Sequence, residues 1–148
     1  MYEKFSPQVD KVVKLANQIA REYDQEYVGT EHVLLAILRE GNGVGAKVLN
    51  FHKIGYERLR ETIDKLIRSS MEETWVFGRL PGTPHFKNVV ATAIEQARQL
   101  ETNRVGTEHL LLALLREKGS VAYRALKELG IRHADVKAQV VELASQIS

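Results

Sequence analysis

The hydrophobic positions of this chain recur with helical spacing, and the pattern occurs twice. Apolar side chains fall three or four positions apart between residues 9 and 23, and again between 86 and 100. Two stretches, 33–38 and 110–115, are apolar at nearly every position. Because a helix turns once in about 3.6 residues, this spacing predicts amphipathic helices around a buried central helix in each half. Strand patterns are nearly absent, so the sequence predicts an all-α protein.

The two halves are copies of one unit. Residues 29–39 read GTEHVLLAILR and residues 106–116 read GTEHLLLALLR, an offset of 77 positions. The same offset aligns Ser6-Pro7 with Thr83-Pro84, and the register holds for roughly 60 residues without a gap. We therefore predict a tandem repeat whose copies pack about a pseudo-twofold axis, as the subunits of a symmetric dimer do.

Each copy is expected to contain four helices, about eight in all. The first begins at a hydroxyl N-cap followed by proline, Ser6 in copy one and Thr83 in copy two. The second begins at the Gly-Thr pair, with Thr30 or Thr107 as its N-cap. The third and fourth helices are expected near 44–51 and 56–68 in copy one, and near 120–129 and 133–147 in copy two.

A connector separates the copies within a single domain. We place repeat one at about 5–68, the connector at 69–82 and repeat two at about 83–147, because the intervening SSMEETWVFGRLPG contains two glycines and a proline. Trp75, Val76 and Phe77 give the connector an apolar character. We favour their packing into a groove between the copies, and the alternative is an exposed segment that binds a partner.

The composition excludes several classes of protein. The 148 residues include no cysteine, which rules out disulfides, a thiol nucleophile and Cys-ligated metal sites. The 21 basic and 19 acidic residues nearly balance, giving a net charge of +2 that argues against a nucleic-acid binder. The N-terminus is not a secretory signal, and no window is apolar enough to span a membrane. We therefore expect a cytoplasmic protein.

Nothing in the sequence predicts an enzyme, a cofactor or a metal site. No two of the five histidines share a helix turn, so zinc ligands at helical spacing are missing. The glycine-rich run at 41–45 lacks the lysine of a phosphate-binding loop and follows no strand, so it is interpreted as a helix–helix turn. No nucleophile elbow is present either. Catalysis is therefore the weakest interpretation, behind a binding module.

The most specific feature is the repeated G-T-E-H. Glu31 or Glu108 at a helix start is favoured by the helix dipole by about 0.3–1 kcal/mol, which accounts for an acidic residue there. The dipole explains less well why glutamate and histidine recur as a pair, and the alternative is a carboxylate that receives a guanidinium. Ser6 and Thr83 place a hydroxyl beside free backbone amides, which suits an anion. If these groups lie near the glutamates, each copy could bind a ligand carrying both phosphate and guanidinium.

The doubled G-T-E-H, each followed by Leu-Leu-x-x-Leu, resembles the Clp N-terminal domain of Hsp100/AAA+ unfoldases, closest to the ClpC type. The resemblance extends from about Phe5 to Ile147. It implies the double Clp repeat fold and a non-catalytic, monomeric domain that recruits protein substrates and adaptors for an ATP-dependent Clp protease. AAA+ modules would act in cis if this is an excised domain. They would act in trans if it is a stand-alone Clp-repeat adaptor or regulator.

ClpC-type domains resemble receptors for phosphorylated arginine, and the resemblance implies a set of site residues. The glutamate of G-T-E-H holds the guanidinium, while the hydroxyl and basic residues at the start of each first helix hold the phosphate. Carried onto this chain, the substrate-binding residues are Ser6, Glu31, Thr83, Lys87 and Glu108.

This sequence departs from the family pattern at the phosphate-binding positions. The usual arginine is Gln8 in copy one and His85 in copy two, and a second basic position is Asp10 in copy one. Copy two, with Thr83, Lys87 and Glu108, is therefore the better equipped. Two weak sites could still act together through avidity on a multiply modified substrate.

Overall fold

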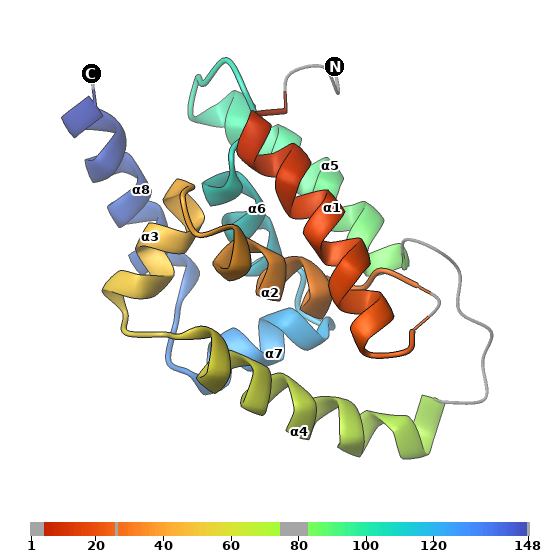
Figure 1. The fold of residues 1–148 in the computed structure, drawn as a ribbon. Coiled ribbons are helices and arrows are strands. Elements are labelled where there is room, and N and C mark those ends of the chain that lie inside the picture. Colours follow the sequence, from red (N-terminus) through yellow and green to blue (C-terminus); the bar gives the residue numbers. More distant parts are fainter. Residues whose placement is uncertain (1–4, 26, 75–82, 148) are drawn as a thin grey trace.

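The computed structural model describes residues 5–25, 27–74 and 83–147, apart from the side chains of 68–74 and 144–147 (Figure 1). These ranges form eight helices and a single bridge between Phe5 and Val105. The all-α prediction is therefore confirmed. In chain order the helices are α1 (Pro7–Glu22), α2 (Thr30–Glu40), α3 (Val44–Phe51), α4 (Tyr56–Thr74), α5 (Pro84–Gln99), α6 (Thr107–Leu114), α7 (Val121–Glu128) and α8 (His133–Ile147).

The helix bounds reproduce the repeat seen in the sequence. Adding 77 to the bounds of α1 and α3 gives those of α5 and α7, and it aligns the starts of α2 and α4 with those of α6 and α8. One predicted bound differs. Helix α4 continues to Thr74 instead of ending at 68, so the first part of the predicted connector is helical. Trp75, Val76 and Phe77 lie outside the described residues.

The starts of the helices are partly as predicted. Ser6 and Thr83 are N-caps, and their hydroxyls accept hydrogen bonds from the amides of Val9 and Phe86, each 3.2 Å long. The prediction that threonine caps the second helix is wrong. The N-cap there is Gly29 in α2 and Gly106 in α6, and threonine is the first helical residue.

Histidine, not threonine, accepts the hydrogen bond of the N-cap amide at the start of its own helix. His32 Nδ1 accepts the amide of Gly29 at 2.9 Å, and His109 Nδ1 accepts the amide of Gly106 at 2.8 Å. The side chain of the third helical residue thus reaches back to the N-cap amide, as glutamate or glutamine does in a capping box. Both histidines are therefore structural groups at the helix starts.

The two threonines instead cap helices of the opposite copy. The Thr107 hydroxyl accepts the amide of Gly45 in α3 at 2.9 Å, and the Thr30 hydroxyl accepts the amide of Ala122 in α7 at 3.3 Å. Both threonines are buried. Since the first four amides of a helix have no intrahelical partner, each hydroxyl satisfies one that burial would otherwise leave unpaired.

The copies also exchange further contacts that form reciprocal pairs. The amide of Ser6 donates to the carbonyl of Val105 at 2.9 Å, and the amide of Thr83 donates to the carbonyl of Val28 at 3.2 Å. Helix α4 packs on α7, and α3 packs on α8. The fourth helix of each copy therefore contacts the third helix of the other, and the predicted pseudo-twofold arrangement is an interlocked one.

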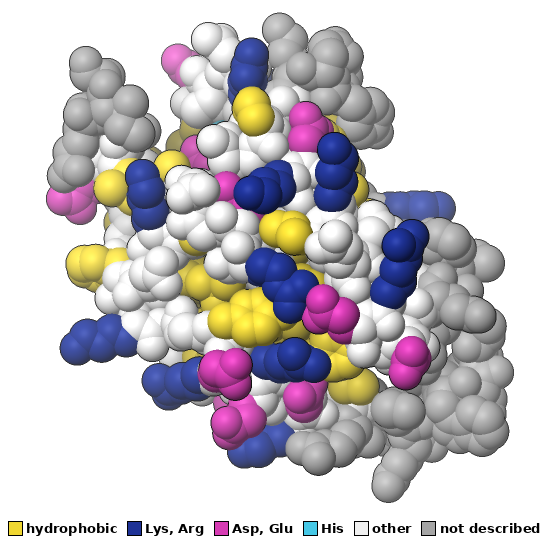
Figure 2. Space-filling view, in the orientation of Figure 1, with side chains coloured by type: hydrophobic (Ala, Val, Ile, Leu, Met, Phe, Trp, Pro, Cys, Tyr) yellow, Lys and Arg dark blue, Asp and Glu magenta, His cyan; other side chains and the backbone are white. Residues whose placement is uncertain are grey.

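Helices α2 and α6 form the centre of the core (Figure 1). Leu34 and Leu35 in α2 and Leu111 and Leu112 in α6 are fully buried, which confirms the predicted buried central helix of each copy. No helix within the described ranges is long and apolar enough to cross a bilayer. On the face shown in Figure 2, lysine and arginine side chains stand among acidic ones instead of forming a basic stripe.

Candidate functional site

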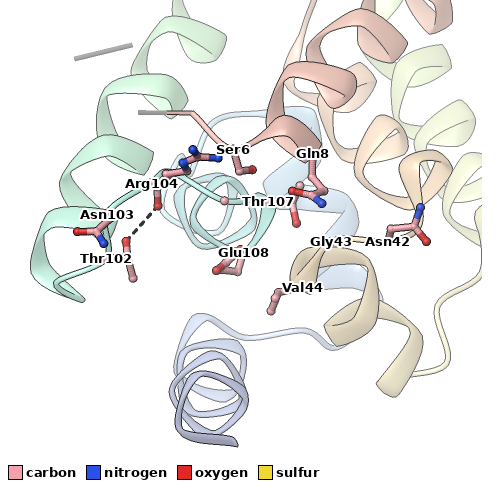
Figure 3. Close-up of a pocket in the computed structure, with 11 residues that line it drawn as sticks. Ser6, Gln8, Asn42, Gly43, Val44, Thr102, Asn103, Arg104, Thr107 and Glu108 are labelled. Carbon is pink, nitrogen blue, oxygen red and sulfur yellow. Dashed lines mark hydrogen bonds between the residues drawn. The ribbon is translucent and has the colours of Figure 1, made fainter. Parts of the chain in front are cut away.

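A hollow of about 500 Å³ lies where the start of α1 meets the start of α6 (Figure 3). It takes its walls from both copies: the first turn of α1 and the α2–α3 turn from copy one, and the segment leading into α6 from copy two. The lining residues are Ser6, Gln8, Asn42, Gly43, Val44, Thr102, Asn103, Arg104, Gly106, Thr107 and Glu108.

Glu108 is the acidic residue among those that line this hollow. It is the second residue of α6 and is half-buried, and it makes no hydrogen bond or ion pair with another described residue. A carboxylate at this position is stabilised by the amides and dipole of the helix start. The Glu108 carboxylate is therefore open to a cationic ligand in the hollow.

Glycine at the N-cap creates the space that this carboxylate occupies. A Cβ built on Gly106 would collide with Glu108 Oε1, and one on Gly29 would lie 2.5 Å from Glu31 Oε1. Both glycines have negative φ angles, −103° and −106°, so the backbone conformation does not require glycine, and an added Cβ would instead displace the end of the glutamate side chain. In G-T-E-H, the glycine makes room, the threonine caps the other copy and the histidine caps its own helix. In copy two this leaves the Glu108 carboxylate without a hydrogen bond or ion pair to another described residue.

Opposite the carboxylate, the hollow offers groups that suit an anion. Arg104 lies exposed in the loop before α6, and the Ser6 hydroxyl and the Gln8 amide stand at the first turn of α1. Arg104 was not among the predicted site residues, because it belongs neither to G-T-E-H nor to the start of a first helix. The signal that could have revealed it is the 77-residue offset, which aligns it with Tyr27.

The structure brings together one predicted pair, but across the copies. Ser6 and Glu108 line the same hollow, because the bond from the Ser6 amide to the Val105 carbonyl holds the start of α1 beside α6. Thr83 and Lys87, which the repeat groups with Glu108 in copy two, are not brought to this hollow. Neither residue lines the hollow, and the amide of Thr83 is bonded instead to Val28, at the start of α2. Lys87 is exposed on the first turn of α5.

The other predicted glutamate lies in different surroundings. Glu31 is only 4% exposed, and its carboxylate accepts a hydrogen bond from Tyr27 Oη at 3.3 Å. The Tyr27 ring also packs against His32, with 5.6 Å between the ring centroids. At the start of α5, His85 Nδ1 lies 2.6 Å from the Glu117 carboxylate. Among the described residues at this end, Glu31 thus contacts Tyr27, and His85 contacts Glu117.

The two capping histidines are held neutral. Burial lowers the pKa of His32 to about 4, and burial likewise lowers the pKa of His109, although the Glu108 carboxylate opposes that shift. A neutral ring is what the fold requires, because Nδ1 must be unprotonated to accept the N-cap amide. Within the described ranges no three potential ligands gather into a metal site.

Comparison with known proteins places the chain among similar sequences. The family model described as "Clp repeat (R) N-terminal domain" matches residues 4–129 and 81–148. "Chaperone protein ClpC1, chloroplastic" of Arabidopsis thaliana is 38% identical over 146 residues, 99% of this chain and 16% of that protein. The "ATP-dependent Clp protease ATP-binding subunit ClpA homolog" of Guillardia theta is 39% identical over 143 residues, 97% of this chain and 17% of that protein.

The relatives are much longer than this chain, and several of them are named for the chloroplast. The chain spans about a sixth of the length of these relatives. Several of the relatives are named chloroplastic, so they do not support the cytoplasmic location expected from the sequence.

Solved structures share the fold at low sequence identity. The N-terminal domain of the chaperone ClpD from Arabidopsis thaliana matches with a TM-score of 0.77 and 19% identity, covering 98% of this chain and 97% of that one. The N-terminal domain of Hsp104 from Candida albicans matches with a TM-score of 0.72 and 17% identity, covering 95% and 91%. The eight-helix arrangement is thus common to all three.

Proposed function

Because the chain belongs to the Clp repeat N-terminal domain family, we propose that it is a non-catalytic module that recruits protein substrates or adaptors to an ATP-dependent Clp unfoldase and its protease. Two observations support this. Relatives that match nearly the whole chain are named as Clp chaperones and as ATP-binding subunits of the Clp protease. The hollow between the copies offers binding groups of both charges on a rigid helical frame.

The group recognised in the hollow is proposed to be a phosphorylated arginine side chain of a substrate protein. Glu108 would accept the guanidinium N–H groups, because a carboxylate is the matching partner for a guanidinium. Arg104, the Ser6 hydroxyl and the start of α1 would hold the phosphate. The observation that carries the proposal is that Ser6, Arg104 and Glu108 line one hollow although they come from both copies.

Loss of the Glu108 carboxylate is expected to abolish recognition without unfolding the domain. Glu108→Gln keeps the shape and removes the charge, so the Kd for phosphoarginine should rise at least about tenfold. Isothermal titration calorimetry with phosphoarginine, and with arginine and phosphate separately as controls, measures this. Glu128→Gln, on the exposed side of α7, is the matched variant and should bind as wild type.

Two results would contradict this assignment. Equal binding by Glu108→Gln and wild type would remove Glu108 from the site. No heat with millimolar phosphoarginine would remove the modified arginine as the ligand. Capture of protein partners would then decide whether the domain docks unmodified adaptors instead.

Gly106→Ala is expected to weaken binding by displacing the carboxylate rather than removing it. The added Cβ would occupy the place of Glu108 Oε1, so the side chain must turn away. Alanine is compatible with the φ of −103° at this position, so the melting temperature should change little. Calorimetry and thermal unfolding of the same sample measure both. Unchanged affinity would show that the position of the carboxylate over the helix start does not matter.

A further inference from the structure

A groove of about 350 Å³ lies between α3 of copy one and α8 of copy two, which run side by side (Figure 1). Its described lining residues are Lys47, Val48, Phe51, Gln139, Glu142 and Leu143, and none of them also lines the hollow around Glu108. Val48 is buried and Leu143 is half-buried, so the groove has an apolar interior.

Phe51 stands exposed at the edge of this groove. It is 72% exposed, more than any other large apolar side chain in the described ranges. The repeat shows that the fold does not require an aromatic residue at this position. The 77-residue offset aligns Phe51, the last residue of α3, with Glu128, the last residue of α7, which is also exposed. An aromatic side chain left in water where the other copy has a carboxylate indicates an interaction surface.

The exposed ring is held in position by its neighbours. Phe51 packs against the ring of His52, with 5.5 Å between the centroids and 86° between the ring planes. His52 is in turn hydrogen-bonded to α8, with 2.7 Å between His52 Nε2 and Gln139 Oε1. Because this bond joins the two walls of the groove, the ring and the groove are already arranged for binding, which lowers the entropy cost of association.

The two walls of the groove carry opposite charges. Lys47 is exposed on α3, and Glu142 is exposed on α8. A twofold axis along the groove would set α3 of one copy opposite α8 of another. Each Lys47 would then face the Glu142 of the second copy, and each Phe51 ring would face the second copy's groove. The surface is therefore complementary to itself in shape and in charge.

We propose that the α3–α8 groove is a self-association surface that binds a second copy of this chain, with Phe51 as its anchor. Aromatic side chains are enriched in protein interfaces, and opposite charges around them fix the orientation of the partners. Two short helical faces bury less surface than a permanent dimer does, so the association is weak and depends on concentration. The proposal differs from the monomer that the family resemblance implies, and it is independent of any ligand in the hollow.

Sedimentation equilibrium at chain concentrations up to about 1 mM tests whether the chain associates. The average mass of wild type is expected to rise with concentration from that of one chain towards that of two. Phe51→Glu should stay monomeric, while Val13→Glu, which changes an exposed apolar residue of α1, should associate as wild type. Both variants replace exposed side chains and should melt as wild type. A wild-type chain that stays monomeric would overturn the proposal and leave the groove to a protein of another sequence. Association that persists in Phe51→Glu would overturn it as well.

Charge reversal tests the twofold arrangement. Lys47→Glu and Glu142→Lys each place like charges across the interface, so each variant alone should associate at least about tenfold more weakly than wild type. An equal mixture of the two variants should form a heterodimer, because one chain then presents two negative groups and the other presents two positive groups. A structural effect within one chain would not be reversed by adding the other variant. Weakened association that does not recover on mixing would therefore overturn the twofold pairing.

Discussion

Replacing Thr30 and Thr107 together with valine is expected to lower the free energy of unfolding by about 2–6 kcal/mol. Each substitution keeps the side-chain shape and removes the acceptor of one buried amide, that of Ala122 or Gly45. A buried donor left without a partner costs about 1–3 kcal/mol. Since a domain of this size has a stability of about 5–15 kcal/mol, the double variant should be severely weakened.

The matched control is Thr62→Val. Thr62 donates only to the carbonyl of Arg58 within its own helix, so its loss should cost little. Urea unfolding followed by circular dichroism, with the single variants alongside, measures the difference. If both single variants and the double variant unfold at the urea concentration of Thr62→Val, the reciprocal caps do not join the copies as described.

Acidification from pH 6.5 to pH 4 is expected to remove about 3 kcal/mol of stability through His32 alone. The folded protein lowers the pKa of this ring to about 4, while the unfolded chain has the ordinary value of 6.5. Each unit of difference is worth about 1.4 kcal/mol. Between pH 6.5 and pH 4, His32 is therefore protonated in the unfolded chain but mostly neutral in the folded protein. The contribution is complete above pH 6.5, falls as the pH drops, and levels off below about 4.

His109 should add to this loss, because its pKa is lowered in the same direction. The variant His32→Gln separates the effect from the titration of carboxylates, since glutamine keeps an acceptor for the Gly29 amide and does not ionise. The difference in unfolding free energy between wild type and His32→Gln, measured from pH 7 to pH 4, should change by about 3 kcal/mol. Parallel curves would show that His32 is not held neutral by the fold.

Local features of the fold were predictable from the sequence, and contacts between the copies were not. Ser6 and Thr83 were recognisable as N-caps, because a hydroxyl residue before proline is a local pattern and its hydrogen bond lies within its own helix. Thr30 was misassigned, because its partner, Ala122, lies 92 residues away and no local pattern indicates it. The extension of α4 to Thr74 was missed for a related reason, since a run of serines and glutamates carries no apolar periodicity.

For the candidate site, too, single residues were predictable and their contacts across the copies were not. Glu108 and Ser6 were identified individually, because each belongs to a repeated motif. Their pairing across the copies depends on the bond between Ser6 and Val105, which the sequence does not reveal. Arg104 was not predicted, because it belongs to no repeated motif: the 77-residue offset aligns it with Tyr27.

Binding of a phosphorylated arginine in the hollow between the copies can be located residue by residue with amide nuclear magnetic resonance. A titration with phosphoarginine is expected to give saturable shifts of the amide signals of Gln8 and of Arg104 to Glu108. The amides of Gly29 to Glu31 should stay unchanged. Shifts centred on Gly29 to Glu31 and the start of α5, or no shifts at millimolar ligand, would rule out binding in this hollow.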